Sequence, residues 1–479
     1  MAAAFCTPPA RTIRSNGTSV HCDWDHWLPS DGADSAPAQS ARYVHAIRDA
    51  VRRLVTGRLR LMRHATVGRA PGCEGRAVLR ARSRGLRRSA AAAVVVLLVA
   101  AVPGVASSAA SEPHVATSAW KIQPIPSIHG GAPVALGSVA CPTANRCVSV
   151  GTASRGRTVP LAEHLNGATW VSSTVTVPRT VVASSLNGVA CLTPTRCVAV
   201  GSTTIHSGGS QVLAERWTGA AWRPTPGRDA TGATYNDLNA VACSTSRCEA
   251  VGFSSPSHLR DTPLVESWNG STWTLQQAAL PAGAQSSTLD AVSCRSSTWC
   301  VAVGQMVVGT APHTLAELWN GTKWSVLSTP DPPGAVASFL RGVSCSSAAR
   351  CLAAGSYVTS GGVSIATAER WNGAAWSLQP PALPAHTKAS YLEGVDCVSA
   401  SVCVAVGKYS TTVRNGYTLV ERLDGATWAI TSSPRPPRAA SSELHAVACT
   451  SKLVCEVVGI ETFSSRTAPL AARTVGLRP

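Results

Sequence analysis

The sequence predicts an all-β protein built from repeated four-stranded units, and three features of its 479 residues support this. The chain has 39 Gly and 31 Pro, and only 14% of its residues are charged, a composition that suits short strands joined by turns. One segment recurs every 50 to 52 residues. Each copy carries two closely spaced cysteines, and six of the seven copies end at a tryptophan.

Each repeat contains four short runs of β-forming residues, which we name strands A to D in chain order. In one copy these runs are Leu186–Cys191, Cys197–Gly201, Leu213–Trp217 and a fourth that begins at Trp222. The repeats open at Leu136, Leu186, Leu238, Leu289, Leu340, Leu392 and Leu444. A period of about fifty residues with four strands per unit is typical of a propeller blade.

Turn-forming dipeptides separate strand C from strand D. They are Asn-Gly at Asn166, Asn269, Asn320 and Asn372, with Asp424-Gly425 and Thr218-Gly219 as variants. Asn-Gly and Asp-Gly accept the positive φ angles of tight hairpins, so strands C and D are expected to pair antiparallel.

One tryptophan opens strand D in each unit. These residues are Trp120, Trp170, Trp222, Trp273, Trp324, Trp376 and Trp428. A repeated indole is expected to pack between neighbouring units with its N–H paired. The alternative is an aromatic platform for a ligand.

The last repeat lacks its own strand D. Leu470–Gly476 matches strand C and its turn, and the sequence given ends three residues later. The missing strand is supplied by Ser118–Trp120, because Trp120 precedes Leu136 by the same spacing that separates the other strand-D tryptophans from the next leucine. We therefore predict a seven-bladed β-propeller over residues 118–476, closed by pairing its first and last strands, which removes the exposed sheet edges.

The cysteines predict seven disulfides. Of 17 Cys, Cys6, Cys22 and Cys73 precede the repeats, and the others form one close pair per repeat. The pairs are Cys141 with Cys147, Cys191 with Cys197, Cys243 with Cys248, Cys294 with Cys300, Cys345 with Cys351, Cys397 with Cys403 and Cys449 with Cys455. A hairpin between strands A and B would bring the Cα atoms within about 4.4 to 6.8 Å. Metal ligation is the rival interpretation, but the spacing is not Cys-x-x-Cys and no His recurs with the pairs, so we expect no metal and no other cofactor.

Residues 80–110 have the order of a secretory signal peptide. An Arg-rich stretch over 80–88 leads into the apolar run Ala90–Val102, and small residues follow over 106–110. The run is shorter than the roughly 20 residues of a membrane-spanning helix, so we expect cleavage near Ala110 and a secreted protein. The protein would contact a membrane only if this segment were uncleaved.

Residues 1–79 form an extension without a domain pattern, which is unusual before a signal peptide. A true start near Met62 or Val78 is one interpretation. The other is a cytoplasmic tail in which Ile47, Val51, Leu54 and Val55 lie on one face of a basic helix.

The charge distribution argues against nucleic-acid binding. Residues 1–110 hold 16 of the 42 Lys and Arg and 6 of the 25 Asp and Glu, so the net charge of +17 falls to +7 over the rest of the chain. These charges are scattered and form no basic stripe. We expect a monomer that binds no nucleic acid.

The corner between strands C and D resembles a known motif. Trp268–Trp273 and Leu423–Trp428 are similar to the Asp-box repeat of sialidase-type propellers, although here the Asn or Asp directly precedes the Gly and the Ser of the motif is missing. With abundant Ala and Arg and only five Lys, the chain also looks like secreted seven-bladed repeat propellers of high-GC bacteria such as actinomycetes. The resemblance implies a fold more than a function.

No catalytic residues are indicated. Six strand-C positions carry the same residue, Glu163, Glu215, Glu266, Glu317, Glu369 and Glu421, with Ala472 in the seventh repeat. Catalysis by carboxylates needs two differently tuned groups, so a ring of identical glutamates favours a structural hydrogen bond.

The candidate ligand face carries the connections from B to C, expected to be 9 to 11 residues long, and from D to the next A. Loops of this kind usually form propeller binding sites. Residues there that depart from the repeat are His258, Arg260, Asp261, Lys408, Tyr409, Arg414 and Tyr417. Each is a candidate binding residue, and the alternative is a solvent-exposed loop residue that binds no ligand.

The leading hypothesis is an extracellular module that binds a glycan, a peptide or an envelope protein through this face. The alternatives are a sialidase-like enzyme that cleaves glycans and a purely structural envelope protein.

Overall fold

The computed structural model describes residues 120–126, 132–178, 180–245, 247–257, 260–412, 415–452, 454–464 and 466–475. The predicted extension over 1–79 and the predicted signal peptide over 80–110 lie outside these residues. The described residues form an all-β structure of antiparallel sheets with four strands each, and single parallel pairs, Tyr235 with Ser210 and Ser441 with Gly416, join two couples of neighbouring sheets.

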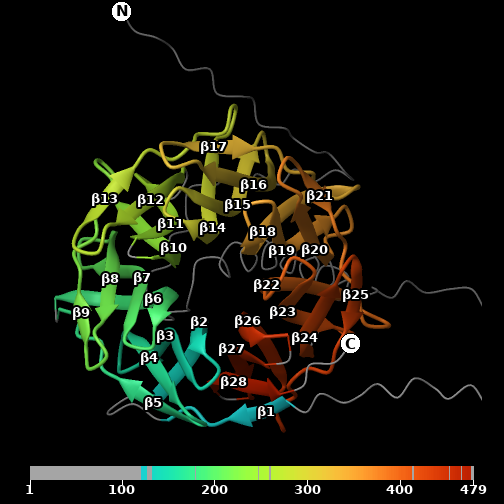
Figure 1. The fold of residues 1–479 in the computed structure, drawn as a ribbon, viewed down its shortest axis with the longest axis horizontal. Coiled ribbons are helices and arrows are strands. Elements are labelled where there is room, and N and C mark those ends of the chain that lie inside the picture. Colours follow the sequence, from blue (N-terminus) through green and yellow to red (C-terminus); the bar gives the residue numbers. More distant parts are fainter. Residues whose placement is uncertain are drawn as a thin grey trace, which may run out of the picture. The chain divides into compact units, whose positions relative to one another are not determined.

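Strand A of each repeat lies nearest the centre of the ring in Figure 1. These strands are β2 (Ala132–Thr143), β6 (Val181–Thr193), β10 (Tyr235–Ser244), β14 (Ser286–Ser296), β18 (Ala335–Ser347), β22 (Ala389–Cys397) and β26 (Ser441–Ser451). Strand B follows as β3 (Arg146–Ser154), β7 (Arg196–Ile205), β11 (Arg247–Ser255), β15 (Trp299–Val308), β19 (Arg350–Thr359), β23 (Val402–Ser410) and β27 (Val454–Thr462).

Strands C and D complete each sheet outward. The C strands are β4 (Thr158–Asn166), β8 (Ser210–Trp217), β12 (Thr262–Trp268), β16 (Ala311–Trp319), β20 (Ser364–Trp371), β24 (Gly416–Asp424) and β28 (Thr467–Val475). The outer strands are β5 (Thr169–Ser173), β9 (Trp222–Pro224), β13 (Trp273–Gln276), β17 (Trp324–Leu327), β21 (Trp376–Leu378), β25 (Thr427–Ile430) and β1 (Trp120–Gln123).

The first described strand completes the last sheet, as predicted. Strand β1 pairs antiparallel with β28, from Trp120 opposite Thr474 to Gln123 opposite Ala471. Each innermost strand contacts those of the two neighbouring repeats, and β2 contacts β26, so the set of sheets closes on itself (Figure 1). This arrangement is a β-propeller.

The hairpins between strands C and D match their dipeptides. The glycines of these turns have φ between 66° and 102° at Gly167, Gly219, Gly270, Gly321, Gly373 and Gly425. Each hairpin pairs antiparallel, for example Val265 opposite Gln276. The Asn-Gly prediction is therefore confirmed.

The hydrophobic core lies between neighbouring sheets. Val148 and Val150 of the first repeat share one buried cluster with Leu186 and Trp222 of the second. At the closure, Leu136 and Trp170 of the first repeat pack with Val458 of the last. A β-sheet must bury its apolar face against another layer, and here the neighbouring sheet supplies that layer.

Most of the strand-D tryptophans donate to the preceding unit, as predicted. The N–H of Trp324 donates to Gln276 Oε1 at 2.8 Å, and that of Trp170 donates to Gln123 Oε1 of β1 at 3.0 Å. Trp376 departs from this pattern, since its buried Nε1 has no partner among the described residues. The reason is local: the position that holds Gln276 or Gln123 elsewhere is occupied by Leu327, which offers no acceptor.

A β-bulge in every strand A determines how closely strands A and B approach. The register shifts directly after the opening leucine in all seven A–B pairs, as between Leu289 and Ala291. The bulge brings the carbonyl oxygen of the preceding residue onto the strand-B glycine. A Cβ at Gly304 would lie 2.1 Å from Thr288 O, and the other six glycines give 1.9 to 2.1 Å. No side chain fits there, which explains the recurring Gly of the repeat.

The structure pairs the cysteines as predicted, with one disulfide in each of the seven predicted pairs. The Cα atoms are 3.9 to 4.1 Å apart, so the predicted range of distances was wrong. The reason is that the cysteines are directly opposite each other in the register, as Cys345 is to Cys351, where antiparallel strands approach most closely. A set of disulfides indicates a protein that resides outside the reducing cytoplasm.

The strand-B cysteine of each disulfide lies in the hydrophobic core, at 0 to 5% exposure, which the sequence analysis did not predict. These residues are Cys147, Cys197, Cys248, Cys300, Cys351, Cys403 and Cys455. Their strand-A partners are half-buried, except for Cys345, which is buried. The reason is that strand B is covered by a neighbouring sheet on each face, so its side chains pack between blades. The strand-B cysteines are therefore core residues in addition to closing the A–B hairpins.

The B to C connections are shorter than predicted, because both strands continue past the repeated motif. Strand β15 pairs with β16 as far as Val308 opposite Ala311, which leaves two residues for the turn. The connection from Ser255 to Thr262 is also shorter than predicted. The prediction of 9 to 11 residues was therefore wrong, and the long connections are those from strand D to the next strand A.

Because β1 completes the last sheet, we expect the stability of the protein to depend strongly on Trp120–Gln123. A chain that starts at Pro124 should lose several kcal/mol of unfolding free energy relative to one that starts at Ser111, because the edge of β28 and the indole contacts of Trp120 are lost. Urea unfolding and size-exclusion chromatography measure this. Equal stability and a monomeric state in both chains would contradict the closure.

Candidate functional site

The bulged residues form the first distinctive group. They are Gly137, Asn187, Asn239, Asp290, Arg341, Glu393 and His445. They differ from repeat to repeat although the residues beside them recur. A bulge redirects the side chain of its extra residue, and the bulged residues belong to the innermost strands of the ring (Figure 1). We call this set the axial ring.

Part of the axial ring joins neighbouring sheets. The Asn187 amide donates to Leu238 O at 3.0 Å, and the Asn239 amide donates to Leu289 O at 2.9 Å. His445 Nδ1 makes the same contact with Leu136 O at 2.9 Å, across the junction between the last and first repeats. Three bulged side chains therefore satisfy the leucine carbonyl of the following repeat.

The remaining part of the axial ring is charged. Arg341 Nη1 lies 2.7 Å from Asp290 Oδ2, and both side chains are largely buried. Burial raises the pKa of Asp290 despite this arginine, and burial also raises the pKa of Glu393 to about 7. Burial therefore favours the neutral form of both carboxyls, and the Arg341 guanidinium offsets part of this effect.

Glu443, beside the bulge of the last repeat, is an exception. Burial would raise its pKa, but the hydrogen bond from His445 and the ammonium of Lys408 together lower it to about 2. The Lys408 Nζ atom is 3.3 Å from Glu443 Oε2. Burial lowers the pKa of His445, but the Glu443 carboxylate outweighs this and raises it overall. Glu443 is therefore an anion held between the Lys408 ammonium and the His445 imidazole.

The hydrogen bond from His445 to Leu136 O can be tested by replacing His445 with asparagine, which makes the equivalent bond in two other repeats. A His445→Ala variant should be about 1 kcal/mol less stable than His445→Asn, because both lose the pairing with Glu443 but only alanine leaves Leu136 O without a donor. Asparagine can keep this donor, since it makes the same contact in the second and third repeats. Urea denaturation of the three proteins measures this, and equal losses in both variants would contradict the assignment.

The strand-C glutamates are buried, and three of them, Glu163, Glu266 and Glu317, accept hydrogen bonds from the framework. Glu266 Oε2 accepts from the backbone N–H of Arg228 at 2.8 Å, and Glu317 Oε2 accepts from that of Ala279 at 3.1 Å. Burial raises the pKa values to about 7 or 8. The partners of these two lie in the connections from strand D to the next strand A, so these glutamates hold the connections against the sheets.

These glutamates predict a pH dependence of stability. The folded-state pKa of Glu317 is raised from 4.5 to about 7, so the native protein binds this proton more tightly than the unfolded chain does. The stabilisation of the folded protein by protonated Glu317 is fully present below pH 4.5 and is lost as the pH rises to about 7. A Glu317→Gln variant cannot ionise, so it should be more stable than the parent at pH 8 and similar to it at pH 4.5.

Urea denaturation at the two pH values measures this difference. Glu317→Ala serves as the control, because it lacks the oxygen that accepts the hydrogen bond from Ala279 N. It should be less stable than Glu317→Gln at both pH values. A parent protein more stable than Glu317→Gln at pH 8 would contradict a protonated Glu317.

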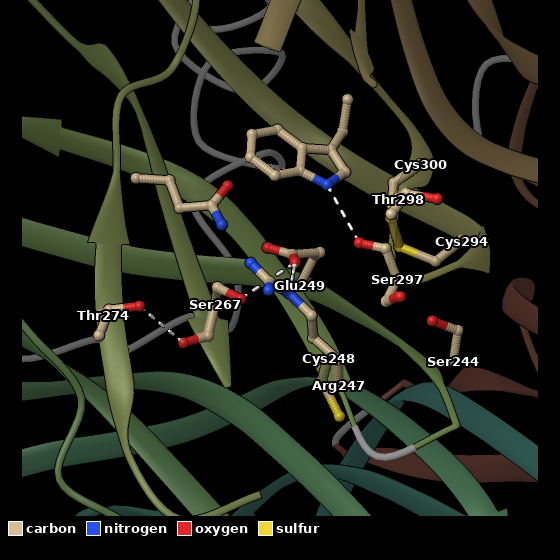
Figure 2. Close-up of polar contacts among 12 residues, drawn as sticks. Ser244, Arg247, Cys248, Glu249, Ser267, Thr274, Cys294, Ser297, Thr298 and Cys300 are labelled. Carbon is tan, nitrogen blue, oxygen red and sulfur yellow. Dashed lines mark hydrogen bonds and ion pairs between the residues drawn. A yellow bond between two sulfur atoms is a disulfide. The ribbon is translucent and has the colours of Figure 1, made fainter. Parts of the chain in front are cut away.

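Glu249 is a buried acid that sequence reasoning missed (Figure 2). It occupies a strand-B position that is apolar in most repeats. Its Oε1 accepts from Arg247 Nε at 2.9 Å and from Ser267 Oγ at 3.0 Å, as Figure 2 shows. Burial raises its pKa, and the Arg247 guanidinium offsets part of that rise. Arg247 also lies 6.0 Å from the ring centroid of Trp319, so the group joins the third and fourth repeats.

A cavity opens in the sixth repeat, at residues that the sequence singled out. It has a volume of about 410 Å³, and its lining includes Pro384, Tyr409, Leu419, Ile430, Thr431 and Arg435. Tyr409 packs on Tyr417 with ring centroids 5.4 Å apart. Arg435 donates to the Tyr409 hydroxyl at 3.2 Å, and its guanidinium lies 5.4 Å from the Tyr417 ring centroid. We call Tyr409, Tyr417 and Arg435 with this cavity the tyrosine site.

The predicted binding residues do not all lie together. Tyr409 and Tyr417 meet at the tyrosine site, whereas Lys408 pairs with Glu443. Arg260 is exposed and Asp261 is half-buried in the third repeat, and no described contact joins either to the sixth. His258 and Arg414 lie outside the described residues.

Neither a metal-binding cluster nor a membrane-spanning helix occurs among the described residues. No cluster of three or more His, Cys, Asp or Glu suited to a metal occurs among the described residues. The described part of the chain contains no helix with the length and hydropathy needed to cross a membrane.

No protein-family model and no curated protein sequence matches the chain. Solved structures with a similar fold include YCF48 bound to a D1 peptide, at 11% identity and a TM-score of 0.46, covering 74% of this chain and 96% of that one. A Dyadobacter fermentans protein of unknown function has 9% identity and a TM-score of 0.46, with 76% and 100% covered. The WD40 propeller domain of Doa1 has 10% identity and a TM-score of 0.45, with 75% and 96% covered.

Proposed function

We propose that the chain is an exported seven-bladed β-propeller that acts as a binding module, with its ligand at the tyrosine site. The observation that carries this proposal is the cavity of about 410 Å³, which Tyr409 and Arg435 line and beside which Tyr417 packs on Tyr409. Concave sites with aromatic walls and a few polar groups are the usual form of a ligand site. The ligand classes considered are a glycan, a peptide and a cell-envelope protein.

The sheets support a binding role by holding the two tyrosines rigidly. Tyr409 and Tyr417 lie opposite each other in the β23–β24 register, so their relative position is set by the backbone. Hydroxyl groups in the cavity are oriented by the framework, since Ser433 Oγ donates to Thr418 O at 2.9 Å and Thr431 Oγ1 donates to Val420 O at 3.2 Å. Their oxygens can therefore accept hydrogen bonds from a ligand.

Export is supported by the seven disulfides together with the signal-like segment of the sequence. Disulfides of this density persist in oxidising compartments. The closed ring supports a protein that remains soluble and monomeric, because the outer edge of each sheet is a short strand of three to five residues.

The proposal predicts that Tyr409 contributes strongly to binding. A Tyr409→Ala variant should lose about tenfold or more in affinity for any ligand found on a glycan and peptide array, because it removes the central aromatic contact. Isothermal titration calorimetry with the best ligand measures this.

Tyr357→Ala is the matched control. Tyr357 occupies the same strand-B position in the fifth repeat, opposite Ile365, and does not line the cavity. Its removal should leave the affinity unchanged. Equal affinity of the Tyr409→Ala variant and the parent would contradict the site, and the absence of any ligand would contradict the binding role.

A further inference from the structure

The connections from strand D to the next strand A contain a recurring left-handed residue. Six positions before the opening leucine, the third, fourth and fifth repeats have glycine with φ of 80°, 75° and 77°, at Gly232, Gly283 and Gly334. The turn is closed by the same hydrogen bond each time, for example from Ala284 N to Pro281 O at 3.2 Å. A positive φ at this place in a turn favours glycine.

The sixth and seventh repeats replace this glycine with basic side chains. His386 has a φ of 62° and Arg438 has a φ of 67°, and both are exposed. The turn around His386 is otherwise unchanged, since Thr387 N donates to Pro384 O at 3.2 Å. Side chains other than glycine are disfavoured in this region of backbone space. Strain retained on a surface turn suggests that the side chain serves a function.

Both turns flank the tyrosine site. Pro384 lines the cavity and begins the turn that holds His386, and Lys388 N donates to Ser410 O at 2.7 Å, next to Tyr409. On the other side Arg435 lines the cavity three residues before Arg438. The nearby acid, Glu421, is buried and its pKa is raised to about 8, so at neutral pH it is largely uncharged. The rim therefore carries a local excess of positive charge.

We propose that the tyrosine site binds an acidic oligosaccharide of the uronate type, whose carboxylates contact Arg435, Arg438 and Lys388. This inference rests on the proposed binding function and names its ligand class. The aromatic pair offers a surface on which a sugar ring can pack, and the oriented Ser and Thr oxygens accept from sugar hydroxyls. Guanidinium groups bind carboxylates with charge-assisted hydrogen bonds. The combination fits a charged sugar better than an apolar peptide.

Two variants of one residue separate charge from strain. Arg438→Gln keeps a side chain at positive φ and removes the charge, whereas Arg438→Gly removes both the charge and the strain. Both should weaken binding of a uronate tetrasaccharide by about tenfold, the effect of losing one charge-assisted contact. Arg438→Gly alone should raise the midpoint of urea unfolding. A purely structural role for Arg438 would leave both affinities unchanged.

The ligands for calorimetry are tetrasaccharides of galacturonate, guluronate and mannuronate, their neutral methyl esters, and a poly-glutamate peptide. We expect at least one uronate to bind, with its ester at least tenfold weaker and the peptide weaker still. Equal binding of acid and ester would overturn the acidic assignment and leave the binding role intact. Binding of the peptide in preference to every saccharide would overturn the assignment of an oligosaccharide ligand and leave the binding role intact. Failure of every probe, together with an empty glycan and peptide array, would overturn both proposals.

Discussion

The close approach between strand A and strand B is the constraint on which the rest of the structure depends. In each repeat a carbonyl oxygen lies where the Cβ of the strand-B residue would be, so that residue is glycine seven times. The approach comes with a bulge directly after the leucine. In six of the seven repeats the bulge turns one side chain out of the regular pattern, and in the first repeat the bulged residue is Gly137. The same backbone feature therefore sets the sheet packing and creates the axial ring.

On this regular framework, the departures from the repeat gather in its second half. The charged members of the axial ring, Asp290, Arg341, Glu393 and His445, belong to the fourth to seventh repeats. The tyrosine site and the two strained basic turns belong to the sixth and seventh. The other positions, including the disulfides, the strand-D indoles and the strand-C glutamates, serve to hold sheets and connections together. Function is expected where a rigid symmetric scaffold is locally broken.

Much of the architecture could be predicted from the sequence because it is encoded by local chemistry. The Asn-Gly dipeptides predicted the C–D hairpins, and the paired cysteines predicted the A–B hairpins. The position of Trp120 predicted the strand that completes the last sheet. Tyr409 and Tyr417 were singled out because they depart from their repeat; the structure packs their rings together, and their role in binding stays a prediction. The axial ring was missed because a bulge is a property of the pairing, although variation after each leucine was a visible signal. Arg435, His386 and Arg438 were missed because their role depends on backbone φ and on neighbours brought by the fold. The B to C turns were overestimated since the strands extend beyond the recurring motif.

The most direct measurement is the free energy of unfolding of a Gly304→Ala variant, in which the added Cβ would lie 2.1 Å from Thr288 O. Gly361→Ala is the control, because its Cβ would meet only Thr359 Oγ1, at an ordinary 3.8 Å. We expect Gly304→Ala to lose about 2 kcal/mol or more, as strands A and B are forced apart, and the control to stay within about 0.5 kcal/mol of the parent. A Gly304→Ala variant as stable as the control would contradict the constraint on which the ring is built.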